Sequence, residues 1–333
     1  MRALKRLNEQ TVVVTGASSG IGRQTALRLA AKGASVVVTA RNGTALAAVA
    51  DEIRRAGGRA LAVPTDVTDE AQVQALAGRA AETFGGIDTW VNNAGVSAYG
   101  SMEQLGSDEF RRVLDVNFLG QVYGCRAALP YLKQRGAGAL ICVGSALSDR
   151  AVPMQSAYCA SKHAVKALTE SLRVELEEAG SEIQVTLIKP SSMNTPLFDQ
   201  AATHMGVKPK PMTPVYDPDL VAQAICYAAE HRTREIAVGG ASKLLSTLEA
   251  FAGPAIDRWM AKTGSKGQQS KQPKSDHAPN NLFAPLPGKG SVRGSFPGRG
   301  VSLYNVARLH PRATLAGALA AGLAGGVWRL GRR

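Results

Sequence analysis

The segment VVVTGASSGIGRQTALRLA, residues 12–30, decides the fold. An apolar, β-branched run leads into a glycine loop and then into a helical pattern. Gly16, Gly20 and Gly22 have the spacing G-x-x-x-G-x-G, in which missing side chains let the backbone turn sharply and approach a pyrophosphate at the N-terminus of the next helix. The segment predicts a dinucleotide-binding unit. A tight turn without a ligand is the alternative interpretation.

Strand and helix patterns alternate from this segment to about residue 240. The first strand candidates are apolar throughout, as expected when helices cover both faces of a parallel sheet. The pattern predicts an α/β fold, a Rossmann-type doubly wound parallel sheet of seven strands. The seven strand candidates are residues 11–15, 35–40, 60–65, 87–93, 139–144, 183–189 and 235–240.

The helix patterns have recognisable ends. Gly33 stands where a left-handed C-terminal residue is expected after the segment 23–32. Asp217 and Pro218 are expected as N-cap and first residue of a helix that runs to His231. Apolar residues at helical spacing follow Tyr158, which predicts a helix over 156–179, and a second long helix is expected over 107–134.

The formal charge of +13 is concentrated at the C-terminus. Residues 262–333 hold twelve Lys or Arg and one acid, Asp276, a balance of +11 that leaves +2 for residues 1–261. The main domain therefore has no electrostatic footprint for nucleic acid. We expect a catalytic domain over 1–261, a Pro, Gly and Lys-rich linker or loosely wrapped extension over 262–312, and an apolar helix with basic flanks over 313–333.

The terminal apolar run, residues 313–328, is sixteen residues long, which is marginal for a membrane-spanning helix. Its arginine flanks predict a peripheral contact with anionic lipid. Packing on the body or on a second subunit is the alternative. Four separated cysteines and the lack of a signal-peptide pattern predict a reducing, cytoplasmic location, and the histidine and cysteine spacing predicts no metal site.

Tyr158 and Lys162, in the segment YCASK, stand four residues apart and so share one helix face. A free tyrosine has a pKa near ~10, too high for efficient acid–base catalysis at neutral pH. One nearby cation could lower it, so Lys162 is expected to lower the pKa of Tyr158. Ser145 closes the fifth strand candidate, where its hydroxyl could bond a reacting oxygen.

Taken together, TGASSGIG (15–22), NNAG (92–95), Asn117, Ser145, Tyr158 and Lys162 resemble the short-chain dehydrogenase/reductase family over roughly residues 10–240. The resemblance implies a nicotinamide cofactor and the catalytic set Asn117, Ser145, Tyr158 and Lys162. It implies that Asn117 holds a water that connects Lys162 to solvent. The expected cofactor-binding residues are Gly16, Ser18, Ser19, Gly20, Ile21, Gly22, Arg41, Asp66, Val67, Asn93, Ala94, Gly95, Tyr158, Lys162, Pro190 and Thr195.

The choice of cofactor depends on the end of the second strand candidate. An acid there would accept a ribose 2′-hydroxyl, whereas an arginine suits a 2′-phosphate. Thr39, Ala40 and Arg41 include no carboxylate, so NADP(H) is favoured over NAD(H). A surface arginine without a ligand is the alternative.

An apolar segment, residues 190–216, lies where the family carries its substrate lid. Met193, Leu197, Phe198 and Met205 belong to it, and Val96, Tyr99, Leu147, Val152 and Met154 are expected to complete a pocket. We therefore expect an NADP(H)-dependent oxidoreductase that interconverts a hydrophobic carbonyl and its alcohol, as a homodimer or homotetramer by family analogy. A cofactor-binding scaffold without turnover and a membrane-attached assembly factor are the alternatives.

Overall fold

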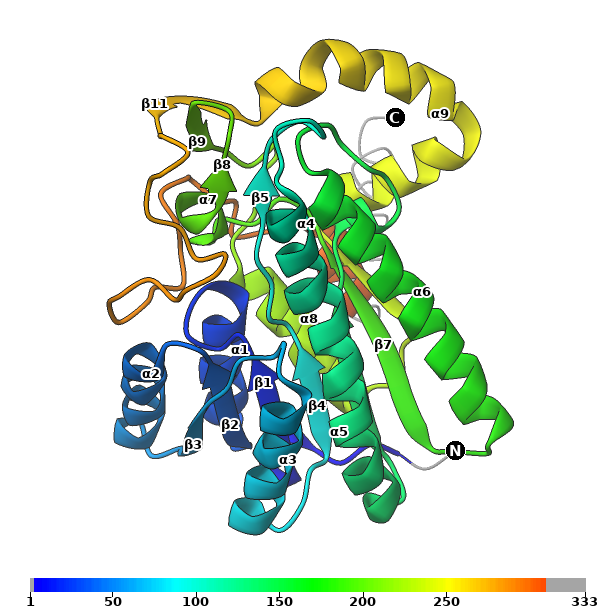
Figure 1. The fold of residues 1–333 in the computed structure, drawn as a ribbon. Coiled ribbons are helices and arrows are strands. Elements are labelled where there is room, and N and C mark those ends of the chain that lie inside the picture. Colours follow the sequence, from blue (N-terminus) through cyan, green and yellow to red (C-terminus); the bar gives the residue numbers. More distant parts are fainter. Residues whose placement is uncertain (1–2, 310–333) are drawn as a thin grey trace, which may run out of the picture.

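A computed structural model describes residues 3–309 of the chain (Figure 1). Its centre is a seven-stranded sheet in the order β10-β7-β6-β4-β1-β2-β3, with all neighbours parallel, so the predicted doubly wound fold is confirmed. The strands are β1 (Thr11–Thr15), β2 (Ser35–Ala40), β3 (Arg59–Pro64), β4 (Thr89–Asn92), β6 (Gly138–Val143), β7 (Ile183–Pro190) and β10 (Glu235–Val238).

Helices cover both faces of this sheet (Figure 1). Val12 and Val14 of β1 face a core with Leu29 and Ile225, whereas Val13 faces the opposite core. This double burial is the reason that the strands are apolar throughout. The helices are α1 (Gly20–Ala31), α2 (Gly43–Arg55), α3 (Glu70–Phe84), α4 (Ser107–Leu114), α5 (Gly120–Arg135), α6 (Ser156–Glu178), α7 (Leu197–Gln200), α8 (Asp219–Glu230), α9 (Gly240–Gly267) and α10 (Leu303–Leu309).

Two predicted helix boundaries need correction. The helix expected over 107–134 is α4 and α5 joined by a π-helical turn, Asp115–Leu119. The helix expected to start at Pro218 begins one residue later, at Asp219. The Asp217 carboxylate still caps this start, because it accepts from the Asp219 N–H at 2.9 Å. Gly33 has the expected left-handed backbone, with φ of +90°.

Short strands and the C-terminal residues lie above the carboxyl edge of the sheet. β5 (Ala98–Tyr99) pairs with β8 (Ala202–Thr203), and β9 (Val207–Pro209) pairs with β11 (Gln269–Pro273). α9 arches over this end, and the chain then returns across one side of the body (Figure 1). Within residues 3–309, no helix is long and apolar enough to cross a membrane. The helix predicted over 313–333 lies outside the described residues.

Candidate active site

A cavity of about 770 Å³ opens at the carboxyl ends of β1, β2, β4, β6 and β7, where doubly wound sheets bind ligands. Sixteen of the eighteen predicted site residues line it. The two that do not are Gly22 and Asn117, which stand behind the cavity wall. The structure therefore brings together residues that the chain spreads over 180 positions.

The glycine loop joins β1 to α1. A Cβ on Gly22 would lie 2.3 Å from the Gly16 carbonyl oxygen, and one on Gly16 would lie 2.8 Å from Cα of Ala94. Both contacts are too close for any side chain, so glycine is required for the loop to pack against the end of β4. This packing turns the N-terminus of α1 toward the cavity, where its peptide dipoles favour an anion. The loop fits the pyrophosphate of a dinucleotide.

Arg41 and Asp66 both line the cavity, after β2 and β3. The Asp66 carboxylate pairs with Arg112 at 2.9 Å and accepts from the Thr68 hydroxyl at 2.9 Å. Burial would raise its pKa, but these hydrogen bonds together hold it below its usual value. The pKa of Arg41 is lowered by burial and by the neighbouring charge of Arg112. Because Arg112 is paired with Asp66, Arg41 is the cation here whose charge suits a negatively charged ligand.

Ser145 follows β6 and begins a short 3-10 turn, Ala146–Ser148. Its hydroxyl oxygen accepts from the Leu147 N–H at 3.0 Å, which fixes the side chain at the cavity wall. The same side chain lies close enough to the Tyr158 hydroxyl group to act against a rise in the pKa of that group. Ser145 and Tyr158 thus present two hydroxyl groups to one point in the cavity.

Tyr158 and Lys162 both lie on α6, and the Lys162 Nζ atom is 5.6 Å from the centre of the Tyr158 ring. The expected lowering of the tyrosine pKa is not found. Desolvation raises the pKa of Tyr158 to about 12, although the Ser145 side chain opposes the rise. Burial also lowers the pKa of Lys162 to about 8. The reason is that both groups lose more hydration than one charge at this distance restores.

Asn117 lies in the π-helical turn between α4 and α5 and is fully buried. Its Oδ1 atom accepts from the Val96 N–H at 2.8 Å, and its Nδ2 atom donates to the Val96 carbonyl oxygen at 3.0 Å and to Ser161 Oγ at 3.1 Å. The extra residue of a π turn aims this side chain at the loop after β4. Asn117 therefore ties that loop to α6.

Comparison with known proteins identifies the family. Residues 10–206 match the model of the short chain dehydrogenases. The chain belongs to this family. It is 41% identical over 282 residues to an uncharacterized oxidoreductase, YxnA, of Bacillus subtilis, covering 84% of this chain and 79% of that protein.

Solved structures of two family members resemble the fold closely. A short chain dehydrogenase/reductase from Burkholderia phymatum in complex with NAD has a TM-score of 0.67 at 30% identity, over 78% of this chain and 97% of that one. An alcohol dehydrogenase from Thermococcus sibiricus complexed with 5-hydroxy-NADP has a TM-score of 0.61 at 27% identity, over 68% and 95%. One of these structures thus contains NAD and the other an NADP derivative.

The other end of the dehydrogenase cavity is apolar. Seven of the nine predicted pocket residues line it, and Met154 and Met205 do not. α9 supplies further lining residues that the sequence did not single out: Leu248, Ala252, Ala255, Ile256, Trp259 and Met260. These six residues recur at helical spacing, which was the available signal, but nothing in the sequence indicated that α9 folds over this edge.

The C-terminal residues contribute a second wall that was also missed. Residues 281–299, which we call the strap, cross the mouth of the cavity, which is lined by Asn281, Pro285–Gly288 and Gly290. The Arg41 guanidinium donates to the carbonyl oxygens of Asn281 at 2.5 Å and Phe283 at 2.8 Å. Part of the segment expected as a linker or loosely wrapped extension is thus hydrogen-bonded to Arg41. Among residues 3–309, no cluster of side chains could hold a metal ion.

Proposed function

We propose that this short chain dehydrogenase uses NADP(H) to interconvert a hydrophobic carbonyl compound and its secondary alcohol. The observation that carries the proposal is the convergence of Ser145, Tyr158 and Lys162 with the glycine loop and Arg41 in one cavity. The glycine loop would hold the pyrophosphate, Asp66 and Val67 would border the adenine, and Thr195 would contact the nicotinamide carboxamide.

NADP(H) is favoured because the end of β2 offers a guanidinium and no carboxylate. Thr39, Ala40 and Arg41 end the strand, and the Asn42 amide lies next to Arg41 at the cavity. A planar guanidinium matches the oxygens of a 2′-phosphate, which a carboxylate at this position would repel.

When bound, the cofactor supplies the hydride to the carbonyl carbon in the reductive direction. Tyr158 gives its hydroxyl proton to the oxygen that becomes an alkoxide, and Ser145 holds the same oxygen by a hydrogen bond. Because its pKa is raised to about 12, Tyr158 is protonated at neutral pH, the form that reduction consumes. The Lys162 ammonium stabilises the phenolate left behind, and Asn117 supports the path by which a proton returns.

The hydrophobic substrate class is supported by the lining of the cavity beyond Tyr158. Val96, Tyr99, Leu147 and Val152 come from the body, and Phe198 and Trp259 come from the lid and α9. Such a surface binds an apolar skeleton by excluding water from both partners. We also propose a homodimer or homotetramer, with α5 and α6 as the interface. Val174 on α6 is 63% exposed, which supports this choice.

The test is a panel of hydrophobic ketones and aldehydes followed at the absorbance of the reduced nicotinamide, with NADPH and NADH. We expect turnover with NADPH, and a loss of kcat of about 10²–10⁴-fold in Tyr158→Phe. Tyr123→Phe is the matched control, because Tyr123 lies on α5 outside the cavity. Undiminished turnover in Tyr158→Phe would contradict the proposed acid, and equal efficiency with NADH would contradict the cofactor preference.

A further inference from the structure

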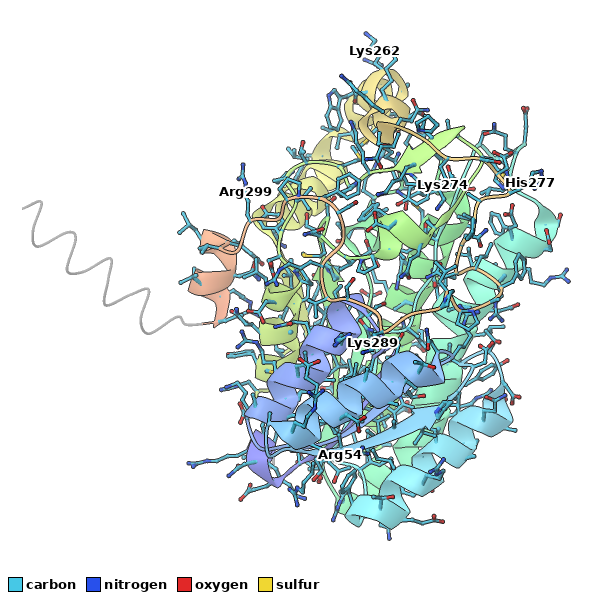
Figure 2. All side chains as sticks on the ribbon, turned by 90° about the vertical axis from the view of Figure 1, so that its left-hand side faces the viewer. Arg54, Lys262, Lys274, His277, Lys289 and Arg299 are labelled. Atoms are coloured by element: carbon cyan, nitrogen blue, oxygen red, sulfur yellow. The ribbon has the colours of Figure 1, made fainter. Side chains whose placement is uncertain are left out.

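The strap approaches the dinucleotide groove from outside and is attached on both sides of it. Asn42 Nδ2 donates to the Leu286 carbonyl oxygen at 2.8 Å, and Arg23 Nη1 donates to the carbonyl oxygens of Lys289 and Gly290, each at 2.9 Å. Figure 2 shows Lys289 on the part of the strap that lies next to α1 and α2, and Arg299 at the other end of the strap, near α10. The strap therefore spans from the end of β2 to the glycine loop.

The middle of the strap touches the glycine loop itself. The Gly20 N–H donates to the Ser291 carbonyl oxygen at 2.8 Å, and a Cβ on Gly290 would lie 2.1 Å from the Ser18 carbonyl oxygen. Further along, a Cβ on Gly294 would lie 2.4 Å from the Thr195 carbonyl oxygen. Only glycine allows the two backbones to come this close. The fit between strap and groove is thus as specific as the fit within the glycine loop.

At its two ends the strap is anchored to the body. The Leu282 side chain is fully buried in the core that contains Val67 and Val116. At the other end, the Phe296 ring meets Phe198 edge-on at 6.2 Å, and Arg299 and Asp217 bond through their backbones. Between these anchors the chain is exposed and held by hydrogen bonds. Such a segment can open locally while its ends remain in place.

We propose that the strap is part of the cofactor site: it forms the outer wall over the adenosine half and must detach before the dinucleotide can leave. The inference rests on the proposed function. Pro285, Leu286 and Pro287 line the cavity together with Ala45 and Val67 of the body. An adenine ring between these surfaces would contact apolar side chains on both of its faces. Leu286 is half-buried in the structure and would lose its remaining contact with water when the ring binds.

Arg41 links the strap to the choice of cofactor. Its guanidinium holds the strap carbonyl groups and is also the group expected to bind a 2′-phosphate. A guanidinium has five N–H donors in a fixed fork, so it can serve both partners at once. A bound 2′-phosphate would then fix Arg41 in the position that anchors the strap. Binding of NADP(H) should therefore stabilise the closed position of the strap, and the closed strap should strengthen the binding of NADP(H).

The first experiment tests the wall by binding, without turnover. The affinities of NADPH and of 2′,5′-ADP are measured by calorimetry for the full chain, for Leu286→Ala and for Leu303→Ala. Leu303 on α10 is 84% exposed and lies outside the strap, so it is the matched control. We expect Leu286→Ala to weaken both ligands about tenfold, or about 1.4 kcal/mol, and Leu303→Ala to bind as the wild type does.

The second experiment tests retention. Bound NADPH is displaced by excess NADP⁺ in a stopped-flow instrument, and its fluorescence gives the dissociation rate. We expect Gly290→Ala to raise this rate at least tenfold, because a methyl group cannot fit beside Ser18, whereas Gly300→Ala, whose Cβ would meet nothing within 4 Å, leaves it unchanged. Trypsin cleavage after Lys289, followed by mass spectrometry, should slow when NADPH is present.

The outcomes separate this inference from the proposed function. The proposed role of the strap would be overturned if all variants had the same nucleotide affinities and NADPH dissociation rates and if NADPH did not change trypsin cleavage. A wild type that binds both nucleotides and shows the expected variant effects, but turns over no carbonyl, would support the wall and overturn the proposed reaction. A wild type that binds neither nucleotide would overturn both. If Gly290→Ala does not fold, Phe296→Ala loosens the strap anchor and is expected to raise the dissociation rate in its place.

Discussion

The two walls of the cavity are built in different ways. The inner wall consists of strand ends and the glycine loop, and its strands are buried on both faces, as in Val12–Val14 at 0% exposure. The strap, as outer wall, holds its place largely by backbone carbonyl groups that accept from Arg23, Arg41 and Asn42. Buried apolar strands resist opening, whereas exposed hydrogen bonds exchange readily with water. The inner wall therefore suits fixed chemistry, and the outer wall suits entry and exit.

The largest expected difference between the walls is in the chemical step. Ser145→Ala should lower kcat by about 10²–10³-fold, because it removes a hydrogen bond to the reacting oxygen. Leu286→Ala should change the affinity for cofactor and leave kcat at saturating NADPH nearly unchanged. Steady-state kinetics with saturating cofactor measure both. A loss of kcat in Leu286→Ala as large as that in Ser145→Ala would contradict the assignment of chemistry to the inner wall and of cofactor binding to the strap.

A second difference is the contribution that the buried cation of the inner wall makes to the pH dependence of stability. The pKa of Lys162 is about 8 in the folded chain, below the ordinary 10.5 that it regains on unfolding. Between these values the unfolded chain binds more protons, so the free energy of unfolding rises with pH. Relative to Lys162→Met, the wild type should gain on the order of 2 kcal/mol from pH 8 to pH 10.5.

Urea unfolding of both proteins across this range measures that gain. The comparison with Lys162→Met cancels the titration of groups that do not interact with Lys162, such as Tyr99 and Cys226, because both proteins share them. A difference in stability that stays constant with pH would mean that Lys162 keeps its ordinary pKa in the folded chain.

The smallest expected difference concerns global stability. Ile141 on β6 is fully buried, so Ile141→Val should lower the free energy of unfolding by about 0.5–1.5 kcal/mol. Leu286→Ala should change it by less than ~0.5 kcal/mol, because the strap can open without unfolding the sheet. Urea unfolding followed by far-UV circular dichroism tests both. A larger loss of unfolding free energy in Leu286→Ala would mean that the strap unfolds cooperatively with the core.

Prediction from the sequence succeeded where local pattern and physical requirement coincide. β-branched runs gave the seven strands, and the spacing of Tyr158 and Lys162 put both on one face of α6. Prediction was weaker where backbone geometry departs from a regular helix. The π turn at Asp115–Leu119 leaves no periodic signature in the sequence. The start of α8 depends on the Asp217 carboxylate, which accepts hydrogen bonds from both the Asp219 N–H and the Arg293 guanidinium.

The sequence by itself determined the fold class, the family and the group of residues that meet at the sheet edge, because apolar periodicity and glycine spacing are written in short stretches of chain. Only the tertiary structure decided how deeply Tyr158 and Lys162 are desolvated, and hence the directions of their pKa shifts. It also decided that residues 281–299 close the groove. That contact is made mainly through backbone carbonyl groups and glycines, which carry no side-chain pattern from which it could be predicted.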